Sequence, residues 1–207
     1  MRTQDVVRRG YDRVSYAYRA DQFVYEGSDY QRYLGWLLDR IKPGQRVLDL
    51  GCGNGVPISR ALVGAGQRVV GADLSPVQIQ RAGALVPDGQ FIEADMTRLA
   101  FAPESFAAIC CFFAIIHVPL AEQPPLLERM AVWLAPGGYL LLTAGSTAWS
   151  GEEEAWCGVT GATMVWSHAD AATYRGWLAE LGFVLLRDAF WPEGGGGHSV
   201  LLARSDP

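Results

Sequence analysis

The 207-residue sequence is poor in the residues that hold metals and build disulfides, with four cysteines and three histidines. No two cysteines form a Cys-x-x-Cys pair, so their spacing builds neither a zinc site nor a disulfide framework. The sequence therefore predicts no bound metal. Cysteines used in this way fit a reducing, cytoplasmic location.

The sequence also lacks a long apolar run and an excess of positive charge. Half of its residues are hydrophobic, yet no stretch of about 20 apolar residues is free of charge, glycine or proline, so no transmembrane helix is expected. The first residues have no apolar core and do not resemble a secretory signal. A net charge of −5 argues against a nucleic-acid partner. We expect a small-molecule partner, no membrane and no nucleic acid, and either a monomer or a homodimer.

Hydrophobic periodicity predicts strands that alternate with helices, which is typical of a parallel sheet wound by helices. The predicted strands cover residues 46–50, 68–73, 90–94, 106–113, 138–144, 183–190 and 198–204. The predicted helices cover residues 3–19, 28–41, 56–65, 76–86, 121–134 and 170–181. Four glycines at 194–197 indicate that the last two strands form an antiparallel hairpin. Residues 145–168 are predicted to be irregular.

One apolar strand runs directly into a glycine loop, in the sequence VLDLGCGNG at residues 47–55. Gly51, Gly53 and Gly55 allow sharp turns and a close approach to a ligand, because they have no Cβ. Asp73 ends the next predicted strand, where a ribose hydroxyl would need an acceptor. The pattern predicts a site for a nucleoside-type cofactor.

The glycine spacing departs from the dinucleotide-binding pattern, which is G-x-G-x-x-G, because the residue after Gly55 is Val56. Asp49 would also repel a pyrophosphate, but it suits a cofactor with an ammonium group. The segment resembles the first motif of class I S-adenosylmethionine-dependent methyltransferases of the small-molecule type. In that family an apolar strand ends in acid-x-G-x-G-x-G.

Further segments strengthen this resemblance, and together the motifs span residues 45–144. They are VVGADLSPVQIQRA (69–82), FIEADMTRLAF (91–101), SFAAICCFFAIIHVP (105–119) and APGGYLLLT (135–143). The resemblance implies that S-adenosyl-L-methionine is the cofactor. It implies that Asp73 accepts from the ribose hydroxyls and that Asp95 accepts from the adenine amino group. The cofactor-binding residues that it implies are Tyr11, Tyr18, Asp49, Gly51, Gly53, Asp73, Leu74, Asp95, Met96 and Phe112.

The resemblance also implies an α/β fold with a Rossmann-like seven-stranded mixed sheet. The implied strand order is 3-2-1-4-5-7-6, with helices on both faces and extra N-terminal helices. We expect one domain over residues 1–207. Its expected parts are lid helices (1–41), a cofactor-binding core (45–144), a substrate-side insertion (145–169), and a C-terminal helix and hairpin (170–207).

Tyr11 and Tyr18 lie seven residues apart, so they share one face of the first helix. The segment YDRVSYAY is similar to the lid helix of small-molecule methyltransferases, in which tyrosines close over the methionine end of the cofactor. The alternative is that both tyrosines pack the helix onto the domain. A closing lid would exclude water from the reaction.

Two histidines are candidate catalytic residues. His117 follows the fourth strand of the core, where it either contacts the substrate or acts as a base, or else forms a structural hydrogen bond. His168 either faces the substrate or caps the helix that begins near residue 170. Residues 149–168 are rich in aromatic and apolar side chains, which either line an acceptor pocket or pack beneath a loop. The candidate substrate-binding residues are Trp149, Trp156, Met164 and Trp166.

The sequence thus predicts an enzyme that transfers a methyl group to an O or N atom of a small aromatic or apolar acceptor. One alternative is a nonenzymatic S-adenosylmethionine-binding module. A second, an NAD-dependent oxidoreductase, is disfavoured by Val56 and by the final hairpin. A methyltransferase of nucleobase amino groups is disfavoured by the absence of an N/D-P-P-Y motif after the fourth strand.

Overall fold

The computed structural model describes residues 2–206, in which seven strands form one sheet with the order β3-β2-β1-β4-β5-β9-β8. The strands are β1 (Arg46–Leu50), β2 (Arg68–Asp73), β3 (Gln90–Glu93), β4 (Phe106–Cys111), β5 (Leu134–Gly145), β8 (Phe183–Glu193) and β9 (Gly196–Ser205). The first five are parallel, and β9 runs antiparallel to both β5 and β8. Numbered within the sheet, the order is 3-2-1-4-5-7-6, so the predicted Rossmann-like mixed sheet is confirmed.

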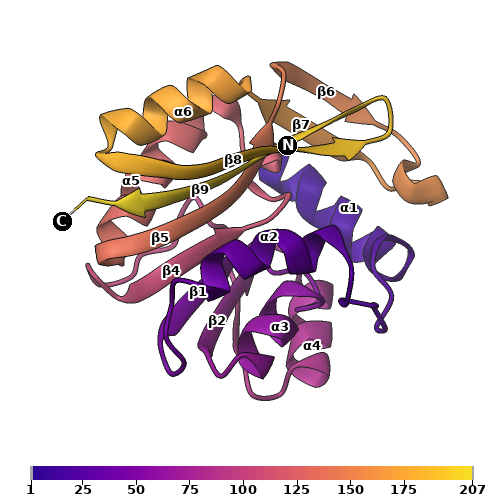
Figure 1. The fold of residues 1–207 in the computed structure, drawn as a ribbon. Coiled ribbons are helices and arrows are strands. Elements are labelled where there is room, and N and C mark those ends of the chain that lie inside the picture. Colours follow the sequence, from indigo (N-terminus) through magenta and orange to yellow (C-terminus); the bar gives the residue numbers. More distant parts are fainter. Residues whose placement is uncertain (1, 207) are drawn as a thin grey trace.

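Helices cover both faces of this sheet (Figure 1). They are α1 (Thr3–Tyr18), α2 (Asp29–Leu38), α3 (Ile58–Gly64), α4 (Pro76–Leu85), α5 (Gln123–Trp133) and α6 (Ala171–Glu180), with short 3₁₀ turns η1 (Ile115–His117), η2 (Leu120–Glu122) and η3 (Trp156–Gly158). Side chains of Ser28, Ser75 and Asp170 cap the N-termini of α2, α4 and α6. These polar residues explain why the three helices begin where they do.

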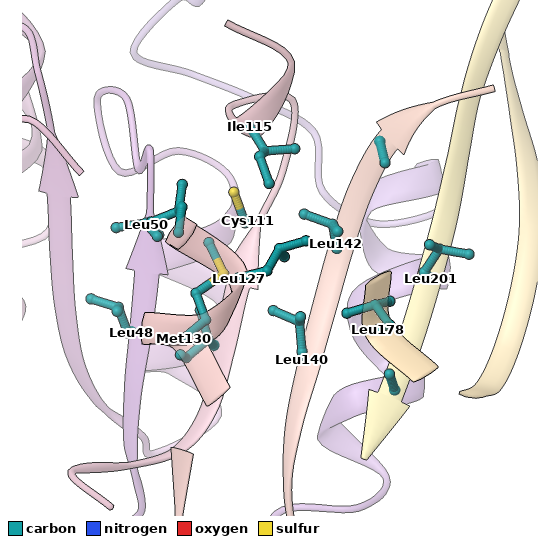
Figure 2. Close-up of a cluster of buried hydrophobic side chains, with 14 of the residues drawn as sticks. Leu48, Leu50, Cys111, Ile115, Leu127, Met130, Leu140, Leu142, Leu178 and Leu201 are labelled. Atoms are coloured by element: carbon teal, nitrogen blue, oxygen red, sulfur yellow. The ribbon is translucent and has the colours of Figure 1, made fainter. Parts of the chain in front are cut away.

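Two buried clusters of side chains join the helices to the sheet. One joins α5 and α6 to one face, and the other joins α2 and α3 to the opposite face. Figure 2 shows the first cluster, in which Leu127 and Met130 of α5 lie against Leu48 of β1 and Leu140 of β5. Because β1 is covered on both faces, its residues from Val47 to Leu50 are all buried, as expected for a central parallel strand.

The largest departure from the sequence prediction lies in residues 145–168, where the expected irregular stretch is wrong. Strands β6 (Trp149–Glu153) and β7 (Met164–His168) form a separate antiparallel pair. Most of β6 is exposed and carries Ser150, Gly151, Glu152 and Glu153, so it lacks the alternating apolar pattern that reveals a strand. The pair lies beside α1, which it contacts through β7 (Figure 1).

Smaller differences concern the ends of elements. β5 begins at Leu134 rather than at 138, because Leu134 already pairs with Phe106 before an irregularity in the ladder. β8 and β9 extend to Glu193 and Gly196, which leaves a shorter turn than the four glycines suggested. Within the described part of the chain, no helix has both the length and the apolar character needed to cross a membrane.

Shortening Leu127 tests the packing of α5 on the sheet. This side chain is fully buried, and its loss leaves a cavity, so Leu127→Ala should lower the free energy of unfolding by about 2–5 kcal/mol. Urea denaturation measures the change. Val132→Ala on the same helix is the control, because Val132 is 54% exposed and should change stability by less than about 0.5 kcal/mol. Equal effects of the two variants would contradict the packing described above.

Candidate active site

A cavity of about 670 Å³, counted with its open mouth, lies at the carboxyl ends of the parallel strands. It sits beside β1 and β4, where the strand order reverses and where ligands of such sheets bind. Its lining residues are Gln4, Val7, Tyr11, Tyr18, Gly51, Gly53, Asp73, Leu74, Gln78, Asp95, Met96, Thr97, Phe112, Phe113, Ala114, His117 and Val118. A smaller cavity of about 420 Å³ shares several of these residues and adds Asp49, Arg19 and Tyr30. The volume is typical of small-molecule sites.

The glycine loop after β1 forms one wall of both cavities. Gly51 and Gly53 have φ values of +79° and +54°, in the left-handed region that glycine adopts without strain. A Cβ on Gly51 would lie 2.2 Å from the Cβ of Ala114. A side chain at Gly51 would therefore push the loop away from the segment that follows β4, and the predicted need for glycine has a steric cause.

Asp73 holds the glycine loop and the start of α4 together. Its Oδ2 accepts a hydrogen bond from the Gly53 N–H at 2.9 Å, and its Oδ1 accepts from the Ser75 N–H at 2.9 Å. Burial raises the pKa of this carboxyl group, against the effect of the two backbone donors. Each carboxylate oxygen retains a further lone pair, and Asp73 lines the larger cavity. Leu74 lines the same cavity.

Asp95 has one oxygen that is engaged and one that is not. Its Oδ1 accepts from both the backbone N–H and the hydroxyl of Thr97, at 3.0 and 2.7 Å. Its Oδ2 is buried and has no hydrogen-bond partner among the described residues. The Nε of Arg98 lies 3.9 Å away, beyond hydrogen-bond distance. A buried acceptor without a donor is costly, so this oxygen is suited to a donor group on a ligand.

Asp49 lies deeper than the other acids, at 2% exposure, and lines the smaller cavity. The hydroxyl of Ser59 donates to its Oδ2 at 2.6 Å. Burial raises the pKa of Asp49 to about 7, although the Ser59 hydrogen bond opposes the shift, and the nearby Asp73 carboxylate raises it further. A cationic group in the smaller cavity would relieve this cost.

Tyr11 of α1 and His117 of η1 form a hydrogen-bonded pair across the larger cavity. The Nδ1 of His117 lies 2.7 Å from the carbonyl oxygen of Val165, and its Nε2 lies 3.0 Å from the Tyr11 hydroxyl. A carbonyl oxygen only accepts, so Nδ1 carries the proton, and the Tyr11 hydroxyl donates to Nε2. Burial lowers the pKa of His117 to about 4, so the imidazole is neutral at physiological pH.

Both predicted lid tyrosines line the cavity, and Trp156 of η3 covers them. The Trp156 ring centroid lies 5.4 Å from that of Tyr11 and 5.1 Å from that of Tyr18. Trp156 is flanked by Ala155 and Cys157, which have φ values of +52° and +55°. Residues other than glycine adopt this conformation at a cost of roughly 1–2 kcal/mol. The aromatic cover over the tyrosines is therefore formed by a strained turn.

The remaining predicted substrate-binding and catalytic residues line neither of the two cavities, and they are Trp149, Met164, Trp166 and His168. Trp166 contacts the ring of His117 at a centroid distance of 5.5 Å, while Trp149 contacts Trp166 and is 48% exposed. Met164 is fully buried and packs beneath α1. His168 lines neither cavity. The cap of α6 is Asp170, whose Oδ1 accepts from the Thr173 N–H, so the alternative that His168 caps this helix is wrong.

Several residues of the cavity wall were missed by the sequence predictions, which included Phe112 but not Gln4, Val7, Gln78, Thr97, Phe113, Ala114 or Val118. The signal for two of them is helical spacing. Gln4 and Val7 lie seven and four residues before Tyr11, on the same face of α1. Within residues 2–206, no group of three histidine, cysteine or acidic residues is arranged to hold a metal ion.

The sheet order, the glycine loop and the acids after β2 and β3 together define a methyltransferase fold of class I. Residues 47–138 match the protein family described as "Methyltransferase domain". The resemblance inferred from the motifs is thereby confirmed.

Individual curated proteins match part of this chain in sequence. The chain is 33% identical over 118 residues to a ubiquinone biosynthesis O-methyltransferase of Paracidovorax citrulli, a match that covers 53% of this chain and 48% of that protein. Matches to curated relatives span between 21 and 48% of the relatives' length.

Two solved structures resemble the whole chain. Magnesium protoporphyrin IX methyltransferase from Synechocystis, solved with bound SAM, has a TM-score of 0.73 at 20% identity and covers 100% of this chain and 98% of its own. The [4+2]-cyclase SpnF has a TM-score of 0.74 at 18% identity, with coverage of 100% and 97%. At these identities the similarity establishes the fold, and the chemistry must be argued from the site.

Replacing Asp49 with asparagine should change how stability depends on pH. The pKa of Asp49 is raised from 3.8 to about 7 in the folded protein. Between these values the folded state binds more protons than the unfolded state, so the wild type loses stability as the pH rises. We expect the unfolding free energy of Asp49→Asn, relative to wild type, to increase by on the order of 4 kcal/mol from pH 4 to 7 and then to level off.

Urea unfolding of both proteins at several pH values between 4 and 8 measures this difference. Asp88→Asn, in an exposed turn, is the control for loss of a surface carboxylate. A relative stability of Asp49→Asn that is the same at pH 4 and pH 8 would show that Asp49 is not a buried carboxyl of raised pKa.

Proposed function

We propose that this protein is an S-adenosyl-L-methionine-dependent methyltransferase that transfers a methyl group to an O or N atom of a small aromatic or apolar acceptor. The observation that carries the proposal is the buried, unpartnered Oδ2 of Asp95, a residue that lines the same cavity as Asp73 and the glycine loop. An adenine amino group would supply the donor that Oδ2 lacks, and ribose hydroxyls would donate to Asp73.

The smaller cavity supports the same cofactor at its amino-acid end. Asp49 and Arg19 both line it, so it offers one anionic and one cationic side chain. An amino-acid group carries an ammonium and a carboxylate and can pair with both. A pyrophosphate carries only negative charge and would be repelled by Asp49. Gly51 and Gly53 line both cavities, and a Cβ on Gly53 would project into open space, so its absence leaves room for a ligand to approach the loop backbone.

When bound, the cofactor would supply an electrophilic methyl group on a sulfonium. The residues of this chain then have to position the acceptor and exclude water. The oxygen of Tyr11 donates its proton to the neutral His117, so its lone pairs remain free to accept from an acceptor hydroxyl or amine. In this role Tyr11 would take the acceptor's proton as it passes its own to Nε2 of His117. Helix α1 would close the cavity to water.

An aromatic or apolar acceptor is supported by the composition of the cavity wall. Tyr11, Phe112, Phe113 and Val118 provide apolar surface, and Trp156 and Trp166 lie behind Tyr11 and His117. Flat apolar molecules bury well against such side chains. The similarity to a ubiquinone biosynthesis O-methyltransferase agrees with this class.

A second candidate function is binding of the same cofactor without methyl transfer. It is favoured by one observation, namely that a [4+2]-cyclase has this fold over the full length of the chain. The two candidates share the cofactor site and differ in the role of Tyr11 and His117. Labelled methyl transfer to a panel of phenols, quinols and amines therefore distinguishes them.

Calorimetric titration with S-adenosylhomocysteine, with NAD as the control ligand, tests the cofactor. We expect micromolar binding of the first and none of the second. Asp95→Asn should weaken binding on the order of tenfold to a hundredfold, because Thr97 holds Oδ1 and the new amide NH₂ replaces Oδ2 opposite a donor. Asp88→Asn is again the surface control. Binding of NAD alone, or full affinity in Asp95→Asn, would refute the proposed site.

Removing the Tyr11 hydroxyl tests its part in methyl transfer. Tyr11→Phe keeps the ring that contacts Trp156 but removes the hydrogen bond to His117. With an acceptor from the panel, we expect turnover to fall on the order of tenfold to a hundredfold, while affinity for S-adenosylhomocysteine changes by less than about threefold. Tyr16→Phe, on the exposed face of the same helix, should retain wild-type turnover. Wild-type turnover in Tyr11→Phe would exclude the hydroxyl from the mechanism.

A further inference from the structure

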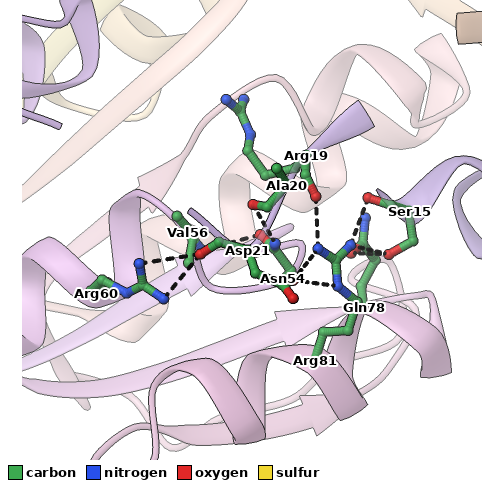
Figure 3. A network of polar contacts seen from close by, with 9 residues as sticks. All are labelled: Ser15, Arg19, Ala20, Asp21, Asn54, Val56, Arg60, Gln78 and Arg81. Atoms are coloured by element: carbon green, nitrogen blue, oxygen red, sulfur yellow. Dashed lines mark hydrogen bonds and ion pairs between the residues drawn. The ribbon is translucent and has the colours of Figure 1, made fainter. Parts of the chain in front are cut away.

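At the C-terminus of α1, the backbone N–H of Arg19 donates to the Ser15 carbonyl oxygen. Its C-cap, Arg19, is extended, and its last turn contains no basic residue. A helix that ends in this way leaves carbonyl oxygens without partners. Here the carbonyl oxygens of four residues at this end also accept from side chains elsewhere in the chain (Figure 3), and they belong to Ser15, Arg19, Ala20 and Asp21.

Arg81 of α4 donates to two of these four carbonyl oxygens. Its Nη1 donates to the backbone and side-chain oxygens of Ser15, both at 2.6 Å, and its Nη2 donates to the Arg19 carbonyl at 2.7 Å. Nη2 also pairs with the Asp21 carboxylate at 2.5 Å. The guanidinium lies 3.9 Å from the ring centroid of Tyr16. One side chain thus binds the last turn of α1 and two of the residues beyond it, Arg19 and Asp21.

Burying this guanidinium costs free energy, so its position in the fold needs an explanation. Arg81 is only 6% exposed, and a buried cation is tolerated when its donors are paired. At the C-terminal end of α1 it also meets the negative end of the helix dipole. Arg81 lines neither cavity, so a direct contact with a ligand does not explain its position.

Ser15 connects Arg81 to the cavity. The guanidinium only donates, so the Ser15 hydroxyl accepts from it and directs its own proton to Oε1 of Gln78, 2.8 Å away. Gln78 is therefore held with its oxygen toward α1, which leaves its NH₂ group as the donor. Gln78 lines both cavities. Arg81 thus acts on the site in two ways, through the main chain of α1 and through the orientation of an amide.

We propose that Arg81 is the positioning residue for the lid of this site. By capping α1 from α4, it holds Tyr11 and Tyr18 over the cavity and presents the NH₂ group of Gln78 to the ligand. Polar contacts join α1 to α4. Asp12 accepts from Ser75, Ser15 donates to Gln78, and Arg81 donates to the Ser15 carbonyl oxygen. Water can replace such contacts when the lid opens to admit a ligand. This inference rests on the proposed function for the identity of the ligand.

Arg81→Met tests the inference, because it keeps the length and apolar stem of the side chain and removes every donor. Arg60→Met is the matched control, since Arg60 also donates to residue 21 but is exposed, with both contacts at 3.4 Å. Two quantities are measured for the full chain. They are the affinity for S-adenosylhomocysteine by calorimetry, and amide hydrogen exchange of α1 compared with β4 and β5.

We expect Arg81→Met to bind S-adenosylhomocysteine about tenfold more weakly, with faster exchange in α1 and unchanged exchange in β4 and β5. Arg60→Met should stay within about twofold of wild type. Wild-type affinity in Arg81→Met would overturn the proposal. If β4 and β5 also lose protection, Arg81→Lys decides. It keeps the charge but cannot reach all four acceptors, so weaker binding with an intact core supports the proposal and wild-type affinity overturns it.

Failure of the proposed function gives a different result. If the wild type does not bind S-adenosylhomocysteine, the cofactor assignment fails, but hydrogen exchange without ligand still tests the anchoring of α1. Faster exchange of α1 in Arg81→Met than in Arg60→Met supports Arg81 as the anchor. Equal exchange in the two variants overturns it.

Discussion

The arrangement of the site depends on the short segment that follows β2, from Asp73 to Ser75. The Asp73 carboxylate accepts from Gly53 in the glycine loop and from Ser75 at the start of α4. The Ser75 hydroxyl accepts from the backbone N–H of Gln78 and so caps α4. The same hydroxyl donates to Asp12 of α1. One turn of chain therefore connects the glycine loop, α4 and α1. The acid that the sequence marks as a ribose acceptor is also the residue that shapes the loop around the ligand.

The same region holds negative charge in a buried setting. Burial raises the pKa of both Asp49 and Asp73. The Asp73 carboxylate raises the pKa of Asp49 further, and the Asp12 carboxylate does the same to Asp73. Such a site is costly when two carboxylates ionise without a cation. A ligand with an ammonium or sulfonium group would lower this cost, whereas a pyrophosphate would add to it. The electrostatics therefore favour the same cofactor class as the glycine spacing, and they do so independently of it.

The core could be predicted from the sequence because its signals are local. The glycine loop, the Ser75-Pro76 helix start and the apolar strands each specify their own conformation. The β6–β7 pair could not be predicted in this way, because Trp149 to Glu153 lack an alternating apolar pattern and pair with residues 11 to 19 positions further along the chain. The capping of α1 was equally invisible, because its donor, Arg81, lies more than 60 residues along the chain.

The position of His117 shows why the lid and the β6–β7 pair have to be considered together. Its Nδ1–H is fixed by the carbonyl of Val165 in β7, and its Nε2 accepts from Tyr11 in α1. The tautomer that makes Nε2 an acceptor therefore depends on β7, and its partner depends on α1 being closed. If either element moved away, His117 would lose a contact that defines its role. A methyl acceptor bound between α1 and β7 would thus meet a proton-accepting group only while both elements keep these contacts with His117.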